Sequence, residues 1–87
     1  MAIDPQRLPE LLMLADAAPS VRAAATVLRE TLAPLRVVVV DAFDMRGETP
    51  AAQGAKRTLW WGASDGHCWS VTAQAGQAAG VFLADRA

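Results

Sequence analysis

Apolar residues recur at helical spacing from the start of the chain. In the first such segment they lie three and four positions apart and share one helix face, at Leu8, Leu11, Leu12 and Ala15. Asp4 and Pro5 are typical of a helix start, because an Asp side chain accepts bonds from free amide groups and proline suits the first helical position. Pro19 disfavours the helical conformation at the residue before it. The pattern predicts a helix over residues 5–17.

A second helical stripe follows directly. Its apolar positions are Val21, Ala24, Ala25, Leu28 and Leu32. Ser20 is placed to cap the start of this segment, and Pro34 stops it. We therefore expect a second helix over residues 20–33. Because only about three residues separate the two segments, they should form a helical hairpin.

The pattern then changes to that of β-strands. Residues 35–43 contain four consecutive valines, which are stiff at χ1 and fit a pleated surface. Because this run is apolar on both faces at its centre, it predicts a central strand that is covered, at least in part, on both sides. Residues 44–55 lack apolar periodicity and are expected to form a loop.

Further strands are expected over residues 57–62, 67–72 and 81–84. The segment from Ala63 to Gly66 predicts a hairpin turn in which Gly66 adopts a positive φ.

Together these segments predict one α+β domain spanning residues 1–87. The N-terminal helical hairpin should pack on one face of a three- to four-stranded, mainly antiparallel sheet. The strand over residues 35–43 should be central, with the hairpin of residues 57–72 beside it.

Composition and charge narrow the class of protein. The chain has 87 residues, 53% of them hydrophobic, and eight basic residues stand against nine acidic ones for a net charge of −1. That balance makes a nucleic-acid partner unlikely, because phosphate neutralisation needs a basic stripe. Only one cysteine is present and no signal peptide or membrane-length apolar run is visible, so the sequence predicts a cytoplasmic protein with no membrane partner. The glycines form no phosphate-binding motif, and no cofactor is predicted.

Three tryptophans are the most prominent candidates for a functional surface. Trp60 and Trp61 are adjacent in a predicted strand and should point to opposite faces of the sheet, with Trp69 near them on the partner strand. At least one indole is then expected on the face away from the helices, where exposed aromatics are common at binding surfaces or can stack on a planar ligand. The alternative is that all three are core or dimer-interface residues.

His67 and Cys68 have side chains that can bind a metal or act in catalysis, but they are poorly placed to act together. Adjacent strand residues point to opposite faces, and the chain has no second histidine or cysteine, so a closed zinc site or a Cys–His pair is not expected. We expect Cys68 to be buried and His67 to lie at the edge of a turn.

Three carboxylates surround the end of the first predicted strand. Asp41, Asp44 and Glu48, with His67 as a weaker addition, are residue types that hold Mg²⁺ or Ca²⁺ or serve as acid and base. Asp41 follows the valine run and is expected to be partly buried and paired with an arginine. The alternative is a strand end with solvated charges and one ion pair.

Several short segments resemble a small bacterial family associated with nitrogen-fixation gene neighbourhoods. They are Leu28-Arg29, the acidic pair Asp41 and Asp44, Asp65-Gly66-His67-Cys68 through Thr72, and Ala79-Gly80-Val81-Phe82-Leu83-Ala84. The chain departs from that pattern after Thr72, where Ala73-Gln74-Ala75 replaces an acidic residue and a proline. The resemblance implies a bacterial accessory protein and implies no particular chemistry.

The sequence therefore favours a non-enzymatic accessory or protein-interaction domain. Its partner would be another protein or a second copy of the chain, bound through a sheet face or edge that carries Trp60, Trp61 and Trp69. The alternative is a protein that binds a small ligand or divalent metal with Asp41, Asp44 and Glu48. An enzyme is least favoured, because no catalytic arrangement is visible.

Overall fold

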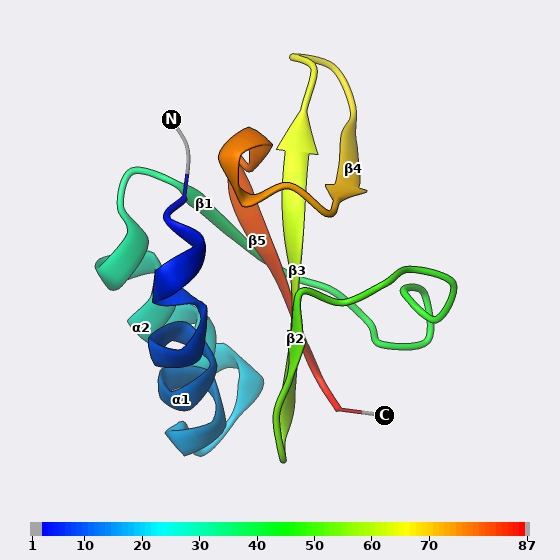
Figure 1. The fold of residues 1–87 in the computed structure, drawn as a ribbon. Coiled ribbons are helices and arrows are strands. Elements are labelled where there is room, and N and C mark those ends of the chain that lie inside the picture. Colours follow the sequence, from blue (N-terminus) through cyan, green and yellow to red (C-terminus); the bar gives the residue numbers. More distant parts are fainter. Residues whose placement is uncertain (1–2, 87) are drawn as a thin grey trace.

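The computed structural model describes residues 3–86; residues 1, 2 and 87 of the predicted domain lie outside the described part. A helical hairpin forms the first layer (Figure 1). It consists of a short 3₁₀ turn η1 (Pro5–Arg7), helix α1 (Leu8–Ala17) and helix α2 (Val21–Leu32). Asp4 caps η1 by accepting from the amide of Gln6, and Ser20 caps α2 by accepting from the amide of Ala23 at 3.1 Å. Both caps lie where the sequence predicted helix starts.

A mixed five-stranded sheet forms the second layer. Its strands are β1 (Arg36–Val39), β2 (Ala52–Gln53), β3 (Arg57–Ser64), β4 (Trp69–Thr72) and β5 (Gly80–Asp85), with a 3₁₀ turn η2 (Ala75–Gln77) before β5. The order across the sheet is β1-β5-β3-β2, and β4 also pairs with β3. β1 runs parallel to β5, and every other pairing is antiparallel. The two-residue strand β2 lies within the segment predicted as loop.

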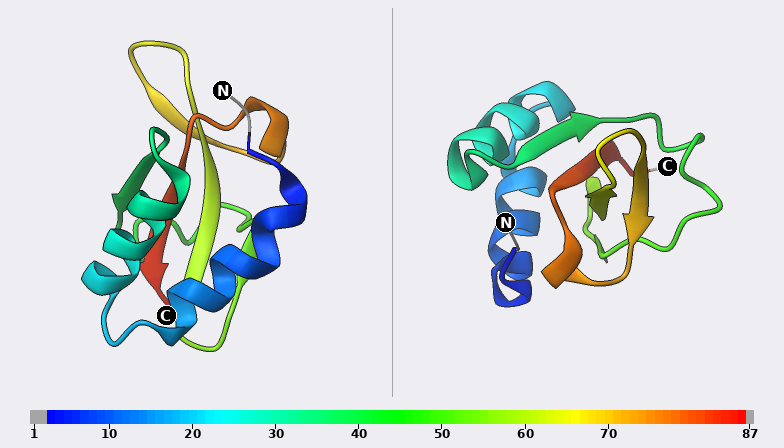
Figure 2. Two further views of the ribbon diagram at one scale, coloured as in Figure 1. Left: turned by 90° about the vertical axis from the view of Figure 1, so that its left-hand side faces the viewer. Right: turned by 90° about the horizontal axis from the view of Figure 1, so that it is seen from above.

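Both helices cover one face of this sheet, and the loop between β1 and β2 lies on the other side (Figures 1 and 2). The largest fully buried side chains come from both layers and are Leu11, Leu28, Leu59, Val81 and Leu83. This arrangement confirms the predicted α+β class with the helical hairpin packed on the sheet. None of the described helices is long and apolar enough to cross a membrane.

The position of β1 corrects the prediction of a central first strand. β5 lies between β1 and β3, which leaves β1 at the edge of the sheet. Val37 packs into the core under the helices, whereas Val38 and Val39 are 36% and 39% exposed. Only Val37 of these three valines is buried, so the apolar run is not covered on both sides, and the local pattern held no information about the strand that would pair beside it.

The first strand also ends earlier than predicted, at Val39 rather than at residue 43. The carboxylate of Asp41 accepts a hydrogen bond from the amide of Phe43 at 2.8 Å, and the amide of Asp44 donates to the Asp41 carbonyl. Asp side chains favour such local turns over a strand ladder. Residues 40–51 therefore form the loop that leads to β2.

The β3–β4 hairpin is shifted relative to the prediction. β3 continues to Ser64 and β4 begins only at Trp69. Asp65 accepts hydrogen bonds from the amides of His67 and Cys68, so residues 65–68 form the turn. Gly66 has a φ of 97°, which confirms the predicted positive φ.

Candidate functional site

Two of the three predicted interaction residues, Trp60 and Trp61, are buried, which leaves Trp69 as the tryptophan that can contribute to an accessible surface. Trp61 is 5% exposed and packs in the core under the helices, and Trp60 is 4% exposed although it points to the opposite face. Residues of the loop 40–51 line a cavity together with Trp60, so this loop covers part of the face away from the helices. Only Trp69 keeps substantial exposure, at 37%.

Trp69 lies across the outer face of β3 and β5. Its ring packs edge-on against Phe82, with a centroid distance of 6.1 Å and an interplanar angle of 74°. A Cβ at Gly62 would lie 3.2 Å from the Trp69 ring and 3.1 Å from the Phe82 ring, so the absence of a side chain at position 62 provides the space for both aromatics. The indole is therefore held in place without being buried.

Three apolar side chains make a continuous surface on this face, and we call it the outer patch: Val38, Phe82 and Trp69. Val38 and Phe82 are directly paired on neighbouring strands, and Phe82 contacts Trp69. Val38 and Trp69 are exposed and Phe82 is half-buried. The patch reaches the edge of the sheet, because β1 has a neighbouring strand on one side only.

The free edge of β1 is partly closed by α2. The amide of Arg36 donates to the carbonyl of Ala79, just before β5, and that of Val40 donates to Leu83 in β5, so the peptide groups of Val37 and Val39 point away from the sheet. The Arg29 guanidinium donates to the Val37 carbonyl from Nε at 3.3 Å and from Nη2 at 3.1 Å. A charged side chain at an edge is a common protection against unwanted strand pairing.

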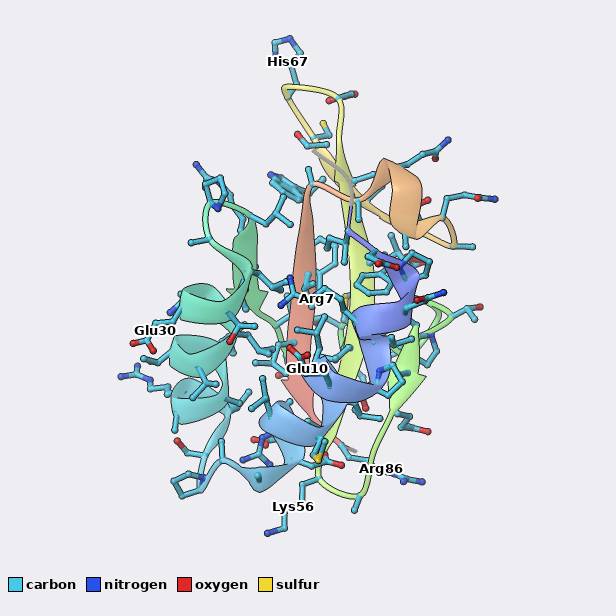
Figure 3. The ribbon with its side chains drawn as sticks, turned by 60° about the vertical axis from the view of Figure 1, so that its left-hand side comes forward. Arg7, Glu10, Glu30, Lys56, His67 and Arg86 are labelled. Atoms are coloured by element: carbon cyan, nitrogen blue, oxygen red, sulfur yellow. The ribbon has the colours of Figure 1, made fainter. Side chains whose placement is uncertain are left out.

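The candidate metal ligands are not brought together. Asp41, Asp44 and Glu48 are all exposed in the loop 40–51, and His67 is exposed at the tip of the β3–β4 hairpin (Figure 3). Within the described part of the chain, no group of three or more His, Cys, Asp or Glu side chains is placed to hold a metal ion. The expected partial burial of Asp41 is wrong, because its carboxylate caps the turn that begins there.

Cys68 is exposed rather than buried, which corrects another prediction. The cause is the shift of the hairpin, since Cys68 lies in the turn instead of in β4. His67 lies at the turn, as predicted. The amides of Cys68 and His67 donate to Asp65 and hold the pKa of that carboxyl below its ordinary value.

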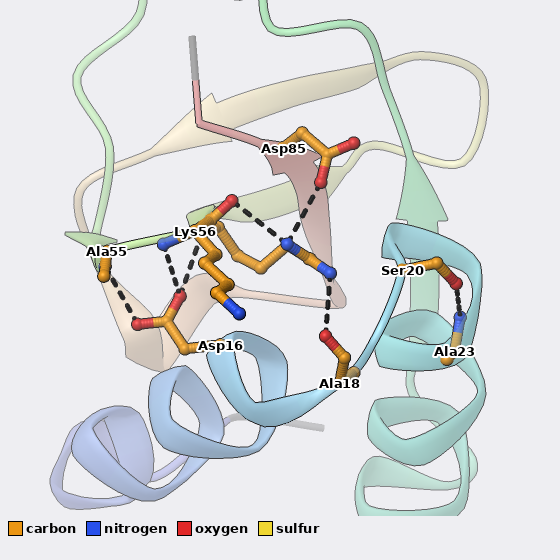
Figure 4. A network of polar contacts seen from close by, with 8 residues as sticks. Asp16, Ala18, Ser20, Ala23, Ala55, Lys56 and Asp85 are labelled. Atoms are coloured by element: carbon orange, nitrogen blue, oxygen red, sulfur yellow. Dashed lines mark hydrogen bonds and ion pairs between the residues drawn. The ribbon is translucent and has the colours of Figure 1, made fainter.

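A polar network between the helices and the sheet was not predicted. The Asp16 carboxylate accepts hydrogen bonds from three consecutive amides, those of Ala55, Lys56 and Arg57, at 3.0, 3.1 and 2.9 Å (Figure 4). A Cβ at Gly54 would collide with this carboxylate. Asp16 therefore ties the end of α1 to the turn between β2 and β3.

Arg57 extends the network into the interior. Its side chain is buried, with the residue 5% exposed, and donates to the carbonyl of Ala18 at 2.9 Å and to that of Lys56 at 3.3 Å. It also pairs with Asp85 at 3.2 Å. These residues lie 39 or more positions from Asp16 or Ala18 in the sequence. No local sequence spacing predicted the hydrogen bonds of Asp16 and Arg57. Together these bonds join the helix layer to the sheet.

Comparison of the chain with protein-family models, with curated proteins and with solved structures finds no match. The resemblance to a bacterial family with nitrogen-fixation neighbours therefore stays a prediction.

Proposed function

We propose that the protein is a non-enzymatic interaction domain and that a partner polypeptide covers the outer patch of Val38, Phe82 and Trp69. The observation that carries the proposal is the placement of Trp69, which is fixed between Gly62 and Phe82 and still exposes 37% of its surface. Ordered, partly exposed tryptophans are enriched among the residues that dominate binding energy.

The surroundings of the patch suit a protein partner. Val39 presents a peptide group at the free edge of β1, next to Val38, so a partner can combine apolar contacts with main-chain hydrogen bonds. A second copy of the chain is one such partner, because a two-fold axis brings the same patch of two subunits together. A homodimer is the first form of the proposal to test.

Light scattering over a concentration series tests the homodimer. We expect the wild-type chain to dimerise and Trp69→Ala to shift the equilibrium toward monomer by at least about tenfold, since central interface tryptophans contribute about 2 kcal/mol or more. Met13→Ala is the matched control, because Met13 is 66% exposed on α1 and lies on the helix layer instead. A wild-type chain that stays monomeric at all concentrations excludes the homodimer form.

Site-specific photocrosslinking in the source cells tests the proposal as a whole. A benzophenone amino acid at position 69 should give discrete adducts with a partner, and the same group at position 13 should not. Adducts at both positions, or at neither, would contradict a role for the outer patch. The melting temperature of each variant confirms that the chain is folded before adducts are compared.

A further inference from the structure

The free edge of β1 presents peptide groups to which a further strand can bind. The N–H and C=O groups of Val37 and Val39 point away from β5, and within residues 3–86 no second strand pairs with β1. Of these four groups, the Val37 carbonyl accepts from Arg29. The Val37 amide and both peptide groups of Val39 are therefore available to an extended polypeptide, which can extend such an edge through main-chain hydrogen bonds.

The surroundings of this edge are positively charged. One hollow, between α2 and the edge, is lined by Arg22, Ala25, Thr26, Arg29 and Val39. A second hollow along the edge is lined by Arg29, Leu35, Arg36, Val37 and Val38. The three arginines are exposed, no acidic residue lines either hollow, and the arginines take part in none of the ion pairs formed within residues 3–86. Guanidinium groups in such surroundings favour a ligand that carries carboxylates.

The alternation of side chains along a strand gives the ligand a pattern. Val37 and Val39 face the helix side of the sheet, whereas Val38 faces the outer side and belongs to the outer patch. A strand paired with β1 places every second side chain on the helix side, next to the hollow of Arg22 and Arg29. Its other side chains lie beside Val38. Acidic residues on the first face and apolar residues on the second therefore match both surroundings.

A second copy of this chain is poorly suited to the β1 edge. Two-fold pairing of two β1 strands would bring Arg22, Arg29 and Arg36 of one subunit against the same residues of the other, and like charges repel. A homodimer formed through the faces of two outer patches does not require this pairing. The net charge of −1 also disfavours nucleic acid, whose binding needs a longer basic stripe.

We propose that the β1 edge binds an extended acidic segment of a partner protein, in which glutamate or aspartate alternates with apolar residues. The carboxylates pair with Arg22 and Arg29, and the main chain bonds to Val37 and Val39. Arg29 uses only its Nε and Nη2 groups on the Val37 carbonyl, which leaves further N–H donors for a carboxylate. The inference rests on the proposed interaction role and adds the chemistry of the partner and the place where it binds.

A peptide titration followed by NMR tests the acidic strand. The probe is a short capped peptide in which glutamate and valine alternate, and its control is a peptide of the same length in which lysine replaces glutamate. We expect the glutamate peptide to shift the backbone amide signals of Val37 and Val39 saturably. It should bind at least about tenfold more tightly than the lysine peptide, because the lysines would face arginines. Equal affinity of the two peptides would overturn the proposal.

Methylated peptides test the main-chain pairing itself. Only every second residue of a strand turns its peptide groups toward a given neighbour. N-methylation of one alternate set of amides in the glutamate peptide should therefore weaken binding at least about tenfold, and methylation of the other set should leave it within about threefold. An equal loss from both sets, or no loss from either, would show that the peptide does not bind as a strand.

Reversal of one charge tests the role of the arginines. Arg22→Glu should weaken the glutamate peptide at least about fivefold, because an attractive pair becomes a repulsive one. Lys56→Glu makes the same change of net charge at the exposed turn between β2 and β3, and it should bind the peptide like the wild type. Equal affinities of the two variants would contradict the proposal, as would tighter binding of a single-stranded oligothymidylate of the same charge. Melting temperatures confirm that both variants are folded.

The two sets of experiments separate this inference from the proposed role of the outer patch. Adducts at position 69, together with a glutamate peptide that does not bind, would support the outer patch and exclude the acidic strand. A glutamate peptide that binds as expected, with no adducts at position 69, would support the acidic strand and exclude the outer patch.

Discussion

The Arg29 guanidinium holds the Val37 carbonyl at the outer edge of β1, with Nη2 3.1 Å and Nε 3.3 Å from the oxygen. Arg29 comes from the last turn of α2, so the helix layer reaches around the edge of the sheet that it covers. A free edge presents unpaired peptide groups to any other extended chain. The peptide groups of Val37 and Val39 point outward from this edge. Arg29 binds one of these groups, the Val37 carbonyl.

Removal of these two hydrogen bonds should make the chain associate through its edge. We expect Arg29→Met, which keeps the length of the side chain and loses its donors, to raise the light-scattering signal during incubation at 37 °C. Arg22→Met makes the same chemical change on the same helix without freeing a β1 carbonyl and serves as the control. The same scattering curve for both variants would mean that Arg29 does not protect the edge.

Gly54 should be intolerant of even one methyl group. A Cβ there would collide with the Asp16 carboxylate, whereas a Cβ at Gly47 would have no atom within 4 Å. We expect Gly54→Ala to lower the free energy of unfolding by about 1–3 kcal/mol, because the carboxylate must leave its three amide donors or shift the turn. Gly47→Ala should change it by less than about 0.5 kcal/mol. Urea unfolding followed by tryptophan fluorescence measures both.

Local signals predicted the helices and most of the strands, and failed on the order of the strands for a physical reason. Asp4 and Ser20 cap helices within two or three residues of themselves, so their effect can be read from neighbouring positions. The place of β1 depends on β5, which begins at Gly80 and pairs with Arg36 across the intervening chain. An apolar run of β-branched residues predicts a strand and does not predict which strand will lie beside it.

The candidate site shows the same division between local and distant effects. Alternation along β3 correctly placed Trp60 and Trp61 on opposite faces. The burial of Trp60 depends on the loop 40–51 passing over the sheet, and a loop without apolar periodicity gives no sign of its path. The contact between Asp16 and the amides that follow Gly54 could not be predicted either, because its partners lie far apart in the sequence.

Arg57 and Asp85 should contribute unequally to stability although they form an ion pair. Asp85 has a side chain that is 63% exposed, so Asp85→Asn should lower the free energy of unfolding by less than about 1 kcal/mol. Arg57→Met should lower it by about 1–3 kcal/mol, since the Ala18 carbonyl would lose its buried donor. Thermal unfolding of both variants provides the comparison. Equal losses would show that the ion pair, and not the contact with Ala18, is the stabilising interaction.

Asp16 should make the stability of the fold depend on pH in the acid range. Burial alone would raise the pKa of this carboxyl, but the amides of Lys56, Ala55 and Arg57 and the charge of Arg57 lower it below its ordinary value of 3.8. A carboxyl whose folded pKa is depressed stabilises the fold fully above its unfolded pKa, and the effect is lost as the pH falls through the folded pKa.

We therefore expect Asp16→Asn to lower the free energy of unfolding by about 1–3 kcal/mol at pH 7, because the amide side chain has no charge and turns a donor toward donors. The difference from the wild type should shrink as the pH falls below about 4, where the carboxyl of the unfolded chain begins to take up a proton, and should be lost as the pH falls through the lower pKa of the folded state. Asp44→Asn, an exposed carboxylate outside the network, should leave the stability at pH 7 within about 0.5 kcal/mol. The urea unfolding midpoints of the wild type and both variants at pH 7 and about pH 2.5 measure these differences. A gap between wild type and Asp16→Asn that stays constant across this range would show that the ionised carboxylate is not what holds the turn.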